Sequence, residues 1–157
     1  METLLSQIAA ALLARKQTLA TAESCTGGLV GAAPTGLPGS SAWYLGGVIA
    51  YSNALKIRLL GVPPEILEAR GAVSPETATA MAAGACAATG ADYAISITGI
   101  AGPAGGTPEK PVGLVYCAVA APRGTATFKH RFSGSRADVR NAAAEAVLRH
   151  LLDALTT

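Results

Sequence analysis

Small aliphatic side chains supply most of the hydrophobic content of this sequence, and this restricts the folds that it can adopt. Half of the residues are hydrophobic, but only 4% are aromatic. A core built from Ala, Val, Leu and Ile is filled only when backbone elements approach closely, as helices do when they pack on a sheet. The length of 157 residues matches one domain, which we expect to span 1–157.

The sparse charge of the chain restricts its partners. Charged residues make up 14% of the sequence and the formal net charge is +2, which is too small to predict a nucleic-acid partner. With so few charges, we expect part of the surface to be buried in a homo-oligomer, with a dimer favoured. No apolar run has the length of a membrane span, and the first residues do not follow the pattern of a secretory leader. We therefore expect a cytoplasmic protein with no membrane partner.

The three cysteines, Cys25, Cys86 and Cys117, indicate neither a disulfide framework nor a zinc site. Their number is odd and no CxxC spacing occurs, which fits a reducing compartment. The His, Asp and Glu residues do not cluster at metal-ligand spacing. The sequence therefore predicts that the protein requires no metal and no cofactor.

Hydrophobic periodicity and turn residues predict helices that alternate with strands. This order is typical of a three-layer α/β/α domain with about five strands and about five helices. The last strands follow one another without a helix, so the sheet should be mixed but mostly parallel. We expect helices over 3–15, after 23–28, over 54–60, 64–69 and 75–89 and after Ser135, and strands over 18–22, 43–51, 93–98, 112–120 and 124–132.

Local signals set some of the expected boundaries. Residues 34–39 contain two prolines and two glycines, which predict a loop. Asn53 is a suitable cap for the helix over 54–60. Ser74 followed by Pro75 is a strong start for the helix over 75–89.

Lys56 is a candidate general base. If Asn53 is the cap, Lys56 lies in the first turn of its helix, where the helix dipole disfavours a positive charge. Partial burial would further favour the neutral amine, which accepts a proton from a serine hydroxyl. The alternative is a solvated helix lysine, which is far commoner among lysines in general.

Ser41 is a candidate nucleophile, and Tyr51 is a candidate partner of the base. Ser41 lies at the end of the Pro/Gly loop, and loops on a rigid scaffold commonly present nucleophiles. The alternative is that Ser40 and Ser41 only satisfy backbone groups of a turn, since no Gly-x-Ser-x-Gly elbow surrounds them. For Tyr51, the alternative is an interfacial aromatic side chain with a satisfied hydroxyl.

Ser24, Cys25, Thr26 and Gly27 form a turn between the strand over 18–22 and the next helix. Backbone N–H groups at a helix N-terminus favour anions, and the hydroxyls of Ser24 and Thr26 add donors. The alternative is an ordinary helix cap. We expect Cys25 to line this site rather than to act as the nucleophile, because neither histidine is a convincing partner.

The loop that follows the strand over 93–98 is a second candidate binding segment. Gly99, Gly102 and Gly105 allow a ligand to approach the backbone, where N–H groups bind a phosphate or an oxyanion, and Thr98 is expected to point into this loop. The glycine spacing matches neither a dinucleotide-binding fingerprint nor a phosphate-binding P-loop. The alternative is a long, flexible hairpin loop.

Arg136 and Arg140 begin the last helix. A guanidinium at this position binds phosphate or carboxylate in a bidentate way. The alternative is a solvated helix face, which we expect for at least one of the two arginines. Arg140 is the favoured phosphate ligand, and Arg136 is the second choice.

Five segments, taken together and in this order, resemble the signature of the CinA C-terminal-domain family. The resemblance extends from about Leu4 to Leu152 and implies a three-layer α/β/α fold. The segments are Ala22-Glu23-Ser24-Cys25-Thr26-Gly27-Gly28, Gly39-Ser40-Ser41-Ala42-Trp43, Tyr51-Ser52-Asn53, Gly71-Ala72-Val73-Ser74 and Gly99-Ile100-Ala101-Gly102-Pro103.

The resemblance also implies an activity. Stand-alone members of the family are nicotinamide-nucleotide amidohydrolases, which implies hydrolysis of nicotinamide mononucleotide to nicotinate mononucleotide and ammonia. The Ser/Tyr/Lys arrangement of the family would map onto Ser41, Tyr51 and Lys56, and the small-molecule partner would be a pyridine nucleotide. The residues themselves support only acyl transfer by a serine hydroxyl. A non-catalytic nucleotide-binding regulatory module therefore stays as the alternative.

Overall fold

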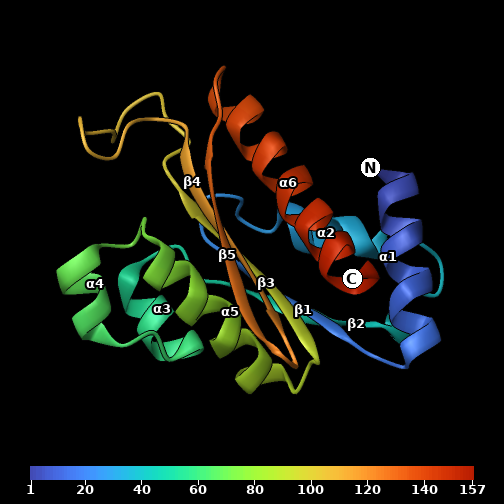
Figure 1. Cartoon of the computed structure of the whole chain (residues 1–157). Helices are drawn as coiled ribbons and strands as arrows, with labels where there is room; N and C mark the ends of the chain where they lie inside the picture. Colours follow the sequence, from blue (N-terminus) through green and yellow to red (C-terminus); the bar gives the residue numbers. More distant parts are fainter.

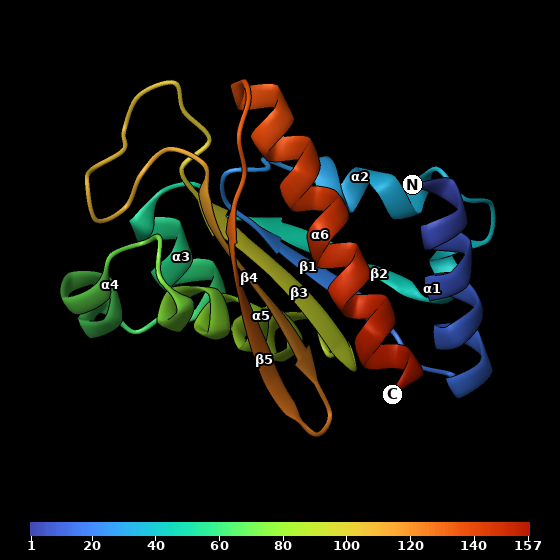
Figure 2. The same ribbon diagram turned by 45° about the horizontal axis from the view of Figure 1, so that its top comes forward.

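A five-stranded sheet separates two layers of helices in the computed structural model, which describes residues 1–157 (Figure 1). The elements are α1 (Glu2–Arg15), β1 (Leu19–Glu23), α2 (Leu29–Thr35), a 3-10 turn (Ser40–Ala42), β2 (Tyr44–Ile49), α3 (Asn53–Leu60), α4 (Pro64–Arg70), α5 (Pro75–Thr89), β3 (Tyr93–Gly99), β4 (Leu114–Ala121), β5 (Gly124–Arg131) and α6 (Arg136–Thr156). Helices α1, α2 and α6 lie on one face of the sheet, and α3, α4 and α5 lie on the other (Figure 2). The expected three-layer α/β/α architecture is confirmed, with six helices.

The strand directions bring the carboxyl ends of four strands to one edge of the sheet. The strand order is β2-β1-β3-β4-β5. Strand β1 is parallel to β2 and β3, whereas β4 is antiparallel to β3 and β5. The mixed sheet is confirmed. Parallel and antiparallel strand pairs are equal in number, because β4 is the one strand that runs in the opposite direction to the other four. We call the edge at Glu23, Ile49 and Gly99 the carboxyl edge, and the opposite edge the amino edge.

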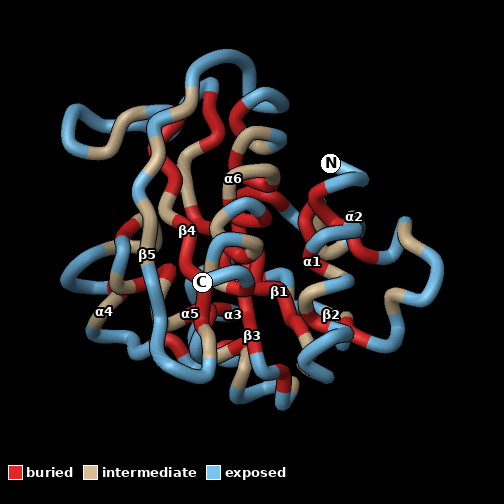
Figure 3. Tube along the Cα trace, turned by 45° about the vertical axis from the view of Figure 1, so that its right-hand side comes forward, coloured by how far each residue is buried: buried red, intermediate tan, exposed pale blue.

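The two faces of the sheet carry different cores. Against α1 and α6, 22 buried residues include long side chains such as Ile8, Leu12 and Trp43. Against α5, the smaller cluster consists mostly of alanines from β1, β3, β4 and α5. These small side chains allow α5 to lie close to the sheet, and Figure 3 shows the buried central strands.

The structure corrects two expected boundaries. Pro34 lies within α2 rather than in a loop, where it removes one backbone N–H from the last turn, and the helix ends one residue later. The cap of α3 is Ser52, whose Oγ accepts a hydrogen bond from the Leu55 N–H at 3.2 Å, and Asn53 is the first helical residue. Lys56 still lies in the first turn.

Two other helix starts agree with the sequence. The Oγ of Ser74 accepts from the Thr77 N–H, and the Oγ of Ser135 accepts from the Asp138 N–H. Both helices are therefore capped by a side chain at the position that the sequence predicts. None of the helices is both long enough and apolar enough to cross a membrane.

Gly84 permits α3 to lie against α5, and its replacement should destabilise the fold. A Cβ at this position would lie 1.8 Å from the Leu60 carbonyl oxygen at the end of α3. Gly84→Ala should lower the free energy of unfolding, measured with urea, by roughly 1–3 kcal/mol, as over-packing does. Helix propensity alone predicts a gain of about 1 kcal/mol, so an increase in stability would contradict the close approach. Ala83→Gly at the exposed neighbour is the control and should lose only about 1 kcal/mol.

Candidate active site

A serine and a lysine meet at the carboxyl edge of the sheet. Ser24 follows the last residue of β1, and its N–H donates to the carbonyl of Ile97 on β3 at 3.0 Å. The Nζ of Lys56, from the first turn of α3, donates to the Oγ of Ser24 at 3.0 Å and to the backbone carbonyl of Tyr51 at 2.9 Å. Both contacts lie where ligands commonly bind in α/β sheets, beyond the carboxyl ends of parallel strands.

The surroundings of Lys56 favour its neutral form. The residue is only 1% exposed and forms no ion pair. Burial lowers the pKa of the Lys56 amine, and the nearby Cys25 opposes this shift. The start of α3 acts in the same direction as burial, since a helix N-terminus disfavours a cation. A neutral amine at this position donates one N–H to the Tyr51 carbonyl and offers its lone pair to the Ser24 hydroxyl.

The prediction that Ser41 is the partner of Lys56 is corrected. Ser41 lies in the 3-10 turn before β2, whereas Lys56 follows the end of that strand. Strand β2 has six residues, which span roughly 20 Å at about 3.3 Å per residue. Ser41 is therefore at the amino edge and exposed, too far from Lys56 for proton transfer. From the sequence we expected Ser24 only to line the site. Its position directly after a buried strand could have indicated that it lies at the carboxyl edge, beside Lys56.

Tyr51 contacts Lys56 through its backbone and not through its phenol. The residue is 61% exposed, and its hydroxyl accepts a hydrogen bond from Nη2 of Arg136 at 3.3 Å. The Nη1 of Arg136 donates to the Gly102 carbonyl at 2.7 Å. Arg136 thus joins the start of α6, the loop after β3 and Tyr51 at the rim of the site, without a carboxylate partner.

Arg140 has a different environment from Arg136. Its Nε donates to the Cys25 carbonyl at 3.1 Å and its Nη2 to the Thr26 carbonyl at 2.9 Å. Because the C=O and N–H of a trans peptide point in opposite directions, the Thr26 N–H points away from Arg140. The N–H groups of Cys25 and Thr26 have no acceptor within the protein, and the Oγ1 of Thr26 is buried without a partner. Arg140 therefore orients a turn that has free donors.

Glu23 holds the other side of this turn. The residue is 1% exposed, and its carboxylate accepts hydrogen bonds from the N–H groups of Gly28 at 3.0 Å, Val30 at 3.1 Å and Gly31 at 2.7 Å. These donors are the cap residue Gly28 and two residues of the first turn of α2, whose N–H groups otherwise lack partners. Gly27 has a φ of 61°, which glycine adopts without strain. The segment from Ser24 to Gly27 is thus fixed at both ends.

The loop after β3 contributes less to the site than the sequence predicts. The Oγ1 of Thr98 donates to the Ala72 carbonyl at 2.7 Å, so its hydroxyl binds the backbone and does not point into the loop. A Cβ at Gly99 would lie 2.7 Å from Cγ2 of Val115, so Gly99 serves the contact between β3 and β4. Gly105 is exposed, and of these residues only Gly102 contacts the rim through Arg136.

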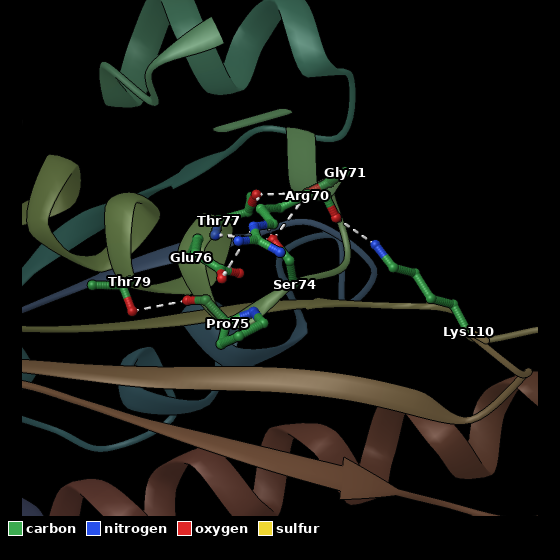
Figure 4. A network of polar contacts seen from close by, with 8 residues as sticks. All are labelled: Arg70, Gly71, Ser74, Pro75, Glu76, Thr77, Thr79 and Lys110. Carbon is green, nitrogen blue, oxygen red and sulfur yellow. Dashed lines mark hydrogen bonds and ion pairs between the residues drawn. The ribbon is translucent and has the colours of Figure 1, made fainter. Parts of the chain in front are cut away.

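The segment from Arg70 to Ser74 contacts this loop from the other side (Figure 4). The hydroxyls of Ser74 and Thr77 donate to the Gly71 carbonyl at 3.0 and 2.7 Å. The Nζ of Lys110, in the loop between β3 and β4, donates to the Arg70 carbonyl. The motif that contains Gly71 therefore supports the loop and supplies no reactive group.

Cys25 is not a reactive thiol in this structure. Burial raises the pKa of the Cys25 thiol to about 11, which disfavours the thiolate that a nucleophile requires. The two histidines lie elsewhere, with His130 on β5 and His150 on α6, and their Nε2 atoms are 2.9 Å apart. No group of three or more His, Cys, Asp or Glu side chains is arranged to hold a metal ion.

Comparison with known proteins identifies the family. A family model described as the CinA C-terminal domain matches residues 1–155. The chain belongs to the CinA C-terminal domain family. It is 49% identical to a CinA-like protein of Desulfotalea psychrophila over 154 residues, which are 98% of this chain and 36% of that protein. It is 53% identical to a CinA-like protein of Anaeromyxobacter dehalogenans over 148 residues, which are 94% of this chain and 36% of that protein.

This CinA C-terminal domain spans about a third of the length of those relatives, but solved structures match it almost completely. The competence/damage inducible protein CihA from Agrobacterium tumefaciens aligns with a TM-score of 0.95 and 41% identity, over 99% of this chain and 95% of that one. A CinA superfamily protein from Escherichia coli aligns with a TM-score of 0.93 and 34% identity, over 96% and 88%.

Replacing Glu23 should destabilise the CinA C-terminal domain. In Glu23→Gln an amide nitrogen replaces one carboxylate oxygen and faces backbone N–H groups, so at least one buried donor loses its acceptor. The free energy of unfolding in urea should fall by about 1–3 kcal/mol, the usual effect of an unsatisfied buried group. Glu68→Gln, which makes the same change at an exposed position of α4, is the control. Equal stability of the two variants would show that the contacts of Glu23 are dispensable.

Proposed function

We propose that this domain hydrolyses the carboxamide of nicotinamide mononucleotide to nicotinate mononucleotide and ammonia, with Ser24 as the nucleophile. The observation that carries the reaction type is the 3.0 Å contact between the Ser24 hydroxyl and the buried amine of Lys56. A serine hydroxyl needs an adjacent base to become nucleophilic, and a desolvated lysine is such a base. The substrate is proposed from the family resemblance described above.

The reaction follows from this contact in two steps. Neutral Lys56 takes the Ser24 proton while the Oγ bonds to the amide carbon; the tetrahedral adduct then breaks its C–N bond and Lys56 returns the proton to the leaving ammonia. Water next attacks the resulting ester, Lys56 accepts its proton, and the carboxylic acid leaves as Ser24 recovers its hydrogen. The Tyr51 carbonyl accepts a hydrogen bond from Nζ at 2.9 Å and so orients the lone pair toward Ser24.

The turn after Ser24 is the proposed oxyanion site. The N–H groups of Cys25 and Thr26 have no acceptor in the protein, and the hydrogen bonds of Arg140 and Glu23 hold the turn in place. Donors that are fixed before the reaction stabilise the developing charge more than mobile ones, and the loss of one such donor typically reduces kcat by about 100- to 1,000-fold. In this assignment Arg140 is a positioning residue.

The phosphate of the nucleotide is assigned to Arg136 rather than to Arg140. The guanidinium of Arg136 is exposed, lacks an acidic partner and bonds only neutral groups at the rim, Gly102 and Tyr51. A phosphate is a stronger acceptor than either. Arg140 is less available to bind the phosphate, because its guanidinium already donates to two carbonyls of the turn. This reverses the preference between the two arginines that the sequence suggested.

Ser24→Ala should abolish the release of ammonia from nicotinamide mononucleotide, because the variant lacks the atom that forms the acyl-enzyme. Ser41→Ala is the matched control, because it removes an exposed hydroxyl at the amino edge of the sheet. This variant should retain activity close to that of the unmodified protein. A coupled ammonia assay measures both, and calorimetry measures nucleotide binding. If Ser41→Ala is the inactive variant, the assignment is reversed; if the unmodified protein binds the nucleotide without releasing ammonia, it is a non-catalytic binding module.

Lys56 should give the reaction a characteristic dependence on pH. Burial lowers the Lys56 pKa, so the neutral base becomes populated below the ordinary lysine value of about 10.4. We expect kcat/KM to rise with pH and to level off above the lowered pKa. Lys56→Arg should be inactive at every pH, since a guanidinium stays protonated. An active Lys56→Arg variant would exclude Lys56 as the base, and a kcat/KM that falls as the pH rises toward the ordinary lysine value would contradict this assignment.

Stability gives an independent check of the same pKa. Between the lowered pKa of folded Lys56 and the ordinary value, the unfolded chain binds more protons than the folded chain. The free energy of unfolding should therefore rise with pH across this window. Lys56→Met removes this titration, so the free energy of unfolding of the variant should rise less steeply with pH than that of the unmodified protein. Urea denaturation at a series of pH values measures the difference.

A further inference from the structure

The two histidines of the chain form a pair outside the proposed active site. His130 lies on the edge strand β5 and His150 lies on α6. Their Nε2 atoms are 2.9 Å apart, which is the length of a hydrogen bond between two nitrogens. The ring centroids are 5.1 Å apart, as expected for two rings that meet nitrogen to nitrogen rather than face to face. The pair therefore joins an edge strand to the last helix.

Two phenylalanines hold the rings in this arrangement. The ring of His150 stacks on Phe128, with centroids 3.6 Å apart and planes 4° apart. The ring of His130 stacks on Phe132, with centroids 5.1 Å apart and planes 10° apart. Both phenylalanines pack against the core beneath α6, and both histidines are half-buried. The stacking restricts the orientation of each imidazole, so the two Nε2 atoms stay directed at each other.

A hydrogen bond between two imidazoles limits the number of protons that the pair can carry. A neutral imidazole has one N–H and one lone pair. One ring therefore donates from Nε2, and the other accepts at Nε2 and carries its own proton on Nδ1. One added proton goes to Nδ1 of the donor ring and leaves the bond intact. A second added proton occupies the accepting lone pair, so both Nε2 atoms become donors and two positive charges meet at 2.9 Å.

The nearby charges on α6 only partly relieve this repulsion. Burial lowers the pKa of both His130 and His150, and for His150 the proximity of His130 adds to the decrease. Asp153, one turn further along α6, acts in the opposite direction on the pKa of His150, but it forms no ion pair with either ring. Arg149 precedes His150, and its guanidinium is paired with Glu145.

The elements packed against β5 and α6 supply no carboxylate to the pair. Lys129 and Arg131 flank His130, but successive side chains of a strand point to opposite faces, so both face the α5 side of the sheet. The residue of β4 opposite His130 is a valine. Asp153 lines a hollow with residues from the N-terminal end of α1, of which only Met1 is charged, through its amino group. The second proton is therefore disfavoured while the rings stay together.

We propose that His130 and His150 form a pH-sensitive switch between β5 and α6, which is closed while the pair carries at most one added proton and opens when both rings are protonated. Opening separates the two rings and lets water solvate each imidazolium. The switch does not use Ser24 or Lys56, which lie at the ends of other elements, and it is therefore independent of the proposed amide hydrolysis.

NMR of the ¹⁵N-labelled protein tests the switch directly, because the chain contains only 2 histidines. Above the titration of the pair, the nitrogen shifts should show that the two Nε2 atoms hold one proton between them. On acidification the rings should titrate in coupled steps, the second of them below the ordinary histidine pKa of about 6.5. The NOEs between the rings of Phe128 and His150 should disappear at that step. Independent titrations near the ordinary value, or NOEs that persist when both rings are protonated, would overturn the proposal.

Glutamine variants separate the pair from the rest of the protein. Between the lowered pKa values of the folded histidines and the ordinary value, the unfolded chain binds more protons than the folded chain. The free energy of unfolding in urea should therefore fall as the pH falls through this window. In His130→Gln and in His150→Gln the single remaining ring has no second imidazolium to repel it, so the fall should be smaller and the remaining histidine should titrate in one step.

Lys129→Gln is the matched control, because it removes an exposed charge from the opposite face of β5. This variant should keep the two coupled steps and the full decrease in stability on acidification. The proposal fails if the glutamine variants at His130 and His150 lose stability as steeply as the unmodified protein. It also fails if Lys129→Gln reduces the decrease as much as they do.

Discussion

The buried amine of Lys56 determines how the carboxyl edge of this protein is arranged. A lysine that is 1% exposed without an ion pair is unfavourable as a cation, because burial removes its hydration. Its Nζ has two hydrogen-bond partners, the Ser24 hydroxyl and the Tyr51 carbonyl. The contact with Tyr51 is local to the start of α3, whereas the contact with Ser24 depends on the first turn of α3 lying against the end of β1. The close approach of α3 and α5 at Gly84 is one condition for that placement.

Two charged side chains build the turn beside this amine, and both bind backbone groups instead of each other. Glu23 accepts from three N–H groups at the start of α2, its cap Gly28 included, and Arg140 donates to two carbonyls of the turn. Charge-assisted hydrogen bonds of this kind are stronger than neutral ones. Between them the N–H groups of Cys25 and Thr26 are left free, which is the arrangement that an oxyanion site requires. The reactive hydroxyl is thus held by a rigid turn.

Much of the fold could be predicted from the sequence, since each element carries a local signal. The apolar runs of β3 and β4, the Ser74-Pro75 start of α5 and the position of Lys56 in a first turn all follow from neighbours within a few residues. The nucleophile could not be predicted in the same way. Ser41 and Ser24 both lie beside an apolar strand in a glycine-containing turn, and local pattern does not say at which edge of the sheet each one lies.

The sequence by itself determined the family, the alternation of helices and strands, and the chemical types available, which are a serine hydroxyl, one suitable lysine and two arginines at the start of α6. Periodicity and capping decide these because they act over short separations along the chain. The tertiary structure decided which serine meets Lys56, which arginine is left exposed, and that Thr98 binds Ala72. Such pairings depend on strand order and direction, which place distant segments at the same edge of the sheet.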